Sequence, residues 1–157
     1  MTAPSSSTAP AIDDGDSTAV GDAESLFDQA IRRYQQGAAP EEVIDDFLQI
    51  TAQQPRLSAG WTCLAWLQLL LDQPHAALRS ARTAVRLNPQ DPHARINLSV
   101  AMLETGQKGV REHVELVQRV MVMAPELAGE LTDSMADGLR RRPGWQALEK
   151  VRGWLQG

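Results

Sequence analysis

The side chains that most often do chemistry are few and scattered in this sequence. His75, His93 and His113 fall in or near expected turns, 18 and 20 residues apart. None belongs to an H-x-x-x-H or H-E-x-x-H pair, which would place two ring nitrogens on one helix face. A shared metal site is therefore not expected. Cys63 is the only cysteine, so an internal disulfide and a thiolate metal cluster are excluded, and its apolar helical surroundings indicate an ordinary buried thiol.

The acidic and basic groupings do not form a recognisable catalytic set either. The segment DDGDS (13–17) lacks the downstream glycine and glutamate of a calcium-binding loop. The basic run Arg140–Arg142 and the stripe of Arg79, Arg82 and Arg86 are typical of a solvated face and of a helix C-terminus. We expect no enzyme, no cofactor and no metal. An enzyme would need a site that none of these residues indicates.

The net charge of −5 is concentrated at the start of the chain. Asp13, Asp14, Asp16, Asp22 and Glu24 are acidic, and no Lys or Arg precedes Arg32. Subtracting these five from the 20 acidic residues leaves 15, which balance the 15 Lys and Arg residues. A neutral body gives no electrostatic reason to bind nucleic acid or an anionic membrane, so neither is expected as a partner.

Residues 1–22 are rich in Ser, Thr, Ala, Pro, Gly and Asp and are expected to be a disordered acidic tail. They carry neither a basic start and apolar run nor an Arg-rich, acid-poor composition, so no targeting signal is expected. The apolar run 64–71 is too short to cross a bilayer. These features favour a cytoplasmic protein without an integral membrane segment. The tail is expected to be a passive tether; the alternative is an autoinhibitory segment that lies across a binding groove.

Prolines divide the chain at regular intervals. Pro55 and Pro89 are 34 residues apart, and Pro89 and Pro125 are 36 apart. Within LNPQDP (87–92), a helix should end near Leu87 and the next should begin with Asp91 as its N-cap and Pro92 in its first turn. Each block also divides in its middle. The pattern predicts pairs of helices, each of about four turns, in an all-α fold.

The bulky, small and proline positions of these blocks resemble those of the tetratricopeptide repeat family. The best copy carries Trp61, Leu64, Ala65, Ala77, Ala84 and Pro89. The first copy carries Phe27, Tyr34, Phe47 and Pro55. The third carries Leu98, Gly106 and Pro125, with Arg95 in place of the early bulky residue. The resemblance is to a small bacterial-type member with about three repeats, and it implies a right-handed α–α superhelix of antiparallel helix pairs.

The expected organisation is a helical domain over residues 23–157 that ends in a capping helix. Its parts are repeats at approximately 24–57, 58–91 and 92–127, followed by C-terminal helices at 128–157. The last helix places its apolar residues at helical spacing: Trp145, Leu148, Val151, Trp154 and Leu155. This pattern is typical of a terminal cap. The alternative is a detachable helix that binds a partner or a membrane surface.

The resemblance implies that the first helix of each pair lines a concave groove. The residues expected there are Thr62, Trp66, Leu69, Leu70, Ile96, Asn97, Val100 and Leu103. Most are large and apolar, which indicates an interface for a peptide or an amphipathic helix. A clamp for C-terminal carboxylates is disfavoured, because only Asn97 fits it and no Lys accompanies it. The alternative is a tightly wound solenoid in which these residues simply pack between neighbouring first helices.

The sequence therefore favours a non-catalytic protein-binding module, an adaptor, scaffold or assembly factor whose partner is another protein. A structural protein is the alternative. It would form a homodimer through the same apolar surface or through the C-terminal helix.

Overall fold

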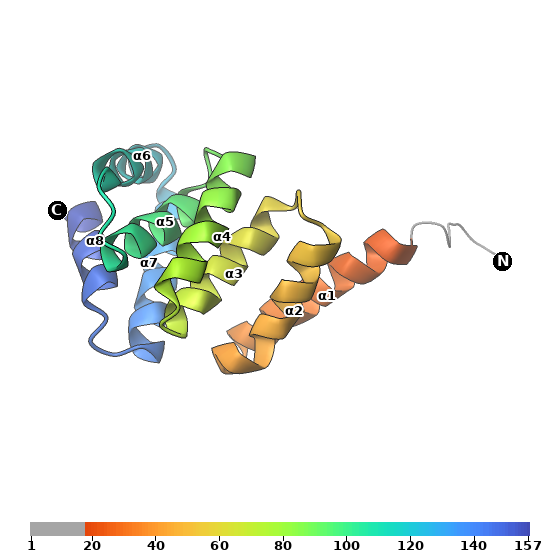
Figure 1. The fold of residues 1–157 in the computed structure, drawn as a ribbon. Coiled ribbons are helices and arrows are strands. Elements are labelled where there is room, and N and C mark those ends of the chain that lie inside the picture. Colours follow the sequence, from red (N-terminus) through yellow and green to blue (C-terminus); the bar gives the residue numbers. More distant parts are fainter. Residues whose placement is uncertain (1–17) are drawn as a thin grey trace. The chain divides into compact units, whose positions relative to one another are not determined.

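The computed structural model describes residues 18–157, and all regular structure in that range is helical (Figure 1). The helices are α1 (Thr18–Gln35), α2 (Pro40–Gln53), α3 (Ser58–Leu70), α4 (Pro74–Leu87), α5 (Pro92–Glu104), α6 (Val110–Met123), α7 (Pro125–Arg141) and α8 (Gln146–Gln156). The predicted all-α fold of helix pairs is confirmed.

Proline defines where several of these helices begin. Pro40, Pro74, Pro92 and Pro125 each occupy the first turn of a helix, where a missing backbone N–H leaves no hydrogen bond unmade. Asp91 caps α5, since its Oδ1 accepts a hydrogen bond from the backbone N–H of His93 at 2.9 Å. The predicted junction at 87–92 is therefore confirmed.

Two predicted boundaries are wrong by a few residues. Residues 18–22, assigned to the tail, form the first turn of α1, because no proline stops the helix between them and Gln35. The rest of the predicted tail, residues 1–17, lies outside the described residues. The C-terminal helices begin at Pro125 and not at residue 128, because the proline itself opens α7.

The chain divides into two compact units, one that ends at Pro55 and one that begins at Arg56. The first contains α1 and α2. Its interior includes an edge-to-face contact between the rings of Phe27 and Phe47, whose centroids are 5.7 Å apart. At its surface the guanidinium of Arg33 lies 2.7 Å from the carboxylate of Asp46.

The second unit contains α3 to α8, and its helices pack in chain order from α3 to α6. Fully buried alanines let successive helices approach closely: Ala65, Ala77, Ala81, Ala84 and Ala101. Between α3 and α4 the hydroxyl of Ser80 donates to Oε1 of Gln68 at 2.7 Å. Helix α7 packs on α6, and α8 packs on α5, α6 and α7. No helix in the described range is both long and apolar enough to cross a bilayer.

Candidate functional site

The residues predicted to line an open groove are mostly interior. Thr62, Leu69, Ile96, Asn97 and Val100 are buried. Trp66, Leu70 and Leu103 are half-buried and pack against the same core. The prediction of a groove open to solvent is therefore wrong for the five buried positions. Two contacts contribute to this burial: α8 packs on α5, and the ring of Trp145 lies against that of Trp66 in α3.

The two polar residues of the predicted groove hold helices together. The side-chain amide of Asn97 in α5 donates to the backbone carbonyl of Thr62 in α3 at 2.9 Å. The hydroxyl of Thr62 donates to the carbonyl of Ser58 at 3.1 Å. Because both groups already have partners inside the unit, Asn97 serves the contact between α3 and α5.

Trp66 of α3 contacts both α7 and the residue that precedes α8. Its ring centroid is 5.4 Å from that of Trp145, at an interplanar angle of 40°. On α7, Gly138 faces the same indole, and a Cβ at that position would lie 2.6 Å from the ring. The predicted groove residue Trp66 therefore packs against α7 and Trp145.

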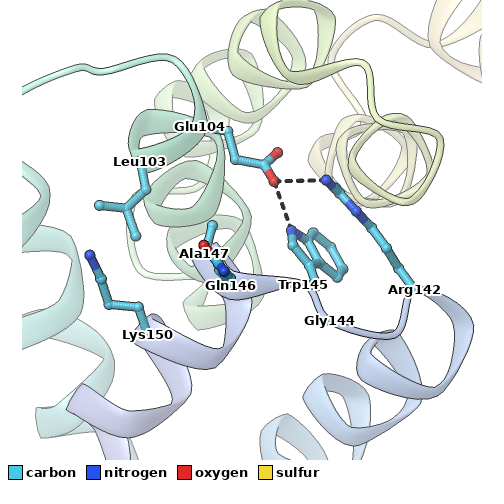
Figure 2. A pocket seen from close by; sticks show the side chains of 8 residues that line it. All are labelled: Leu103, Glu104, Arg142, Gly144, Trp145, Gln146, Ala147 and Lys150. Carbon is cyan, nitrogen blue, oxygen red and sulfur yellow. Dashed lines mark hydrogen bonds and ion pairs between the residues drawn. The ribbon is translucent and has the colours of Figure 1, made fainter.

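The connection between α7 and α8 forms a polar cluster, which we call the Arg142 cluster: Arg142, Trp145 and Glu104 (Figure 2). Arg142 Nη2 lies 3.2 Å from Glu104 Oε2, and its guanidinium lies 4.7 Å from the centroid of the Trp145 ring. The indole N–H of Trp145 donates to the same Glu104 Oε2 at 2.9 Å.

Arg142 also joins the cluster to α3. Its Nη1 donates to the backbone carbonyl of Leu69 at 2.7 Å, and its Nη2 lies 3.3 Å from the carboxylate of Asp72. One guanidinium therefore holds the end of α3, the end of α5 and the start of α8 together. The other oxygen of Glu104, Oε1, is buried and finds no hydrogen-bond partner among the described residues.

A cavity of about 420 Å³ opens beside this cluster (Figure 2). It is lined by Leu103, Glu104, Arg142, Gly144, Trp145, Gln146, Ala147 and Lys150. Of the predicted groove residues, Leu103 alone lines it. The cavity combines an apolar wall with two cations and one carboxylate, which suits a peptide segment better than a small apolar ligand.

The histidines and the cysteine do not come together in one site among the described residues. Among the described residues no three His, Cys, Asp or Glu side chains are close enough to hold a metal ion. Burial, aided by the charge of Arg95, lowers the pKa of His113, whose Nδ1 lies 2.7 Å from Arg95 Nη1. Burial, and then the charge of Asp91, raises the pKa of the Cys63 thiol from 9.0 to about 12, so this cysteine is a poor nucleophile at neutral pH.

Known structures share this fold, although no protein-family model and no curated protein matches the sequence. The Yersinia enterocolitica type III secretion translocator chaperone SycD, in an alternative dimer, is 18% identical with a TM-score of 0.61, over 88% of this chain and 94% of that one. SycD in complex with a peptide of the translocator YopD is 18% identical with a TM-score of 0.60, over 82% and 91%. A chain of the CopN–Scc3 complex is 19% identical with a TM-score of 0.58, over 74% and 68%.

The chain has the helical fold of these structures. At this level of identity the likeness establishes the fold alone.

The Arg142 cluster was not predicted from the sequence. Its one local signal is the segment RPGW (142–145), in which a helix-breaking Pro-Gly pair brings an arginine and a tryptophan close together. Nothing near Glu104 in the sequence indicates that it is their partner.

Proposed function

We propose that this chain is a non-catalytic protein-binding module of the tetratricopeptide type, an adaptor or chaperone that holds a peptide or amphipathic helix on the inner face of its helix pairs. One observation carries the proposal: α8, an amphipathic helix, already packs against α5. Its apolar residues Leu148 and Val151 are fully buried, whereas Glu149 and Lys150 are exposed. A surface that accepts one such helix has the shape and polarity to accept another.

The structural neighbours support the same reading. SycD has been seen with a peptide of YopD, and a second neighbour is part of the CopN–Scc3 complex. Those partners belong to those proteins, and what we carry over is the class of activity, the binding of a protein segment by a helical-repeat fold. A non-enzymatic role agrees with this class. The cytoplasmic location predicted from the sequence remains a prediction.

The half-buried groove residues Trp66, Leu70 and Leu103 are the first contacts we propose for a partner. They are the predicted groove residues that retain solvent exposure. The buried ones, Thr62, Leu69, Ile96, Asn97 and Val100, would become contacts only if the covering helices move.

Affinity capture with the full chain tests the proposal. Wild type and Leu103→Glu are immobilised and exposed to lysate, with Leu48→Glu as the matched control, because Leu48 is an exposed leucine of α2. Proteins held by wild type and by Leu48→Glu should be lost with Leu103→Glu while circular dichroism stays helical. If all three chains capture the same proteins, partner binding does not involve this face.

Self-association is a second candidate, favoured by exposed apolar side chains on α6 and α8. Val122 and Met123 are 82% and 84% exposed, and Trp154 is 40% exposed. Sedimentation at micromolar concentration separates the two functions. A single species near 17.2 kDa excludes a homodimer, whereas a doubled mass that Val122→Lys abolishes supports it.

A further inference from the structure

We propose that α8 is a releasable cover, and that the partner's site is the surface which α8 now occupies. This inference rests on the proposed function and names its partner class: an amphipathic helix with a large aromatic residue, a leucine and a valine at the spacing of Trp145, Leu148 and Val151. We call the surface the α8 site. It is formed by the faces of α5, α6 and α7 that contact α8, together with Trp66.

The length of α8 makes its structure dependent on this site. At 11 residues, α8 is shorter than the roughly 12–15 residues that an isolated helix needs to be even marginally stable in water. Its buried residues lie on one side, and the exposed Gln146, Glu149 and Lys150 are on the other. Packing on the site therefore keeps α8 helical, and a partner helix with the same apolar stripe could replace those contacts.

The connection that precedes α8 can act as a hinge. Four residues, 142–145, separate α7 from α8. Gly144 has a φ of +77°, a conformation that glycine adopts at little cost, and Pro143 and Gly144 are both exposed. No heavy atom of the described residues would meet a Cβ at Gly144 within 4 Å. Rotation at this glycine would move α8 together with Trp145, so the contacts that opening must break are those of Trp145 with Trp66, Arg142 and Glu104.

The Arg142 cluster holds the start of α8 in place through the carboxylate of Glu104, of which only one oxygen has partners among the described residues. Glu104 Oε2 accepts from both Arg142 and Trp145, whereas Oε1 is buried without a partner in the described part of the chain. Opening of α8 would expose this oxygen to water, which can supply the missing donor. The cavity beside Leu103 already admits solvent at this end of α8, where a partner can enter.

Hydrogen exchange on the full-length wild-type chain tests the cover directly. If α8 opens on its own, its amides should exchange at least about tenfold faster than interior amides of α3 and α5, because local opening requires less free energy than global unfolding. Glu104→Gln should accelerate amide exchange in α8 further and leave exchange in α3 unchanged, since it removes the charge opposite Arg142. Asp72→Asn is the matched control, because Asp72 also contacts Arg142 but lies at the end of α3.

Equal protection of α8, α3 and α5 in wild type and in Glu104→Gln would overturn the proposal, since α8 would then be a permanent part of the core. The same holds if Asp72→Asn accelerates α8 as much as Glu104→Gln does.

A peptide of residues 143–156 carrying a fluorescent label tests the partner class. It should bind the full chain in trans, and about tenfold more tightly to Glu104→Gln than to wild type, because its site is open more often. The same peptide with Leu148→Asp and Val151→Asp should not bind.

If α8 exchanges early but neither chain binds the peptide, the assignment of a helical partner to this site is overturned. If the peptide binds as expected but lysate capture does not depend on Leu103, the cover stands and the proposed function fails.

Discussion

Gly138 of α7 faces the indole of Trp66 in α3 so closely that there is no room for another carbon atom between them. A Cβ at Gly138 would lie 2.6 Å from Cζ2 and 2.7 Å from Cη2 of the ring, and 3.0 Å from Cδ2 of Leu148. The indole is rigid and already contacts Trp145, so it has little freedom to move aside. The absence of a side chain at Gly138 thus sets how closely α7 approaches α3.

Gly138→Ala should therefore destabilise the chain by about 1–3 kcal/mol, the usual cost of overpacking a core. Gly129→Ala in the same helix is the control, because no described heavy atom lies within 4 Å of its Cβ position. That change should raise the free energy of unfolding by about 0.5–1 kcal/mol through helix propensity alone. Urea denaturation followed by circular dichroism measures both. Stabilisation by both alanines would contradict the close contact.

Arg142 should be coupled more strongly to Glu104 than to Asp72, although it contacts both carboxylates. The Glu104 side chain is 13% exposed and the Asp72 side chain 76%, so solvent screens only the second pair effectively. Double-mutant cycles of Arg142→Ala with Glu104→Gln and with Asp72→Asn measure the difference. We expect a coupling of about 1–3 kcal/mol for the first pair and below about 1 kcal/mol for the second. Equal coupling energies would show that the buried pair with Glu104 is no stronger than the exposed pair with Asp72.

The features that sequence analysis predicted correctly have local causes. A proline constrains its own helix turn, and Asp91 caps α5 through an amide two residues away. The features it missed depend on packing between distant segments. Helical spacing predicted the apolar stripe of Trp145, Leu148 and Val151, but periodicity does not tell which surface faces a stripe. Val100 has the same pattern whether it lines an open groove or lies under a covering helix, and only the tertiary fold distinguishes the two.

His113 should make the stability of the chain depend on pH. Burial and the charge of Arg95 lower its pKa below the ordinary value of 6.5. Between the two pKa values the unfolded chain binds the proton more readily, so the contribution of His113 is complete above pH 6.5 and is lost as the pH falls through the folded value. His113→Gln should reduce the loss of stability between pH 7.5 and pH 5.5 in urea denaturation. His75→Gln, a change of an exposed histidine, should leave it as in wild type.

Cys63 should react slowly with thiol reagents while the chain is folded. Burial, and then the charge of Asp91, raises its pKa from 9.0 to about 12, which lowers the thiolate fraction at pH 8 about a thousandfold. Labelling with a chromogenic disulfide at pH 8 should therefore be slower in buffer than in denaturant. Because burial is the larger cause, Asp91→Asn should accelerate it only modestly, and asparagine still caps α5. Labelling of the folded chain at the denatured rate would mean that Cys63 is open to solvent.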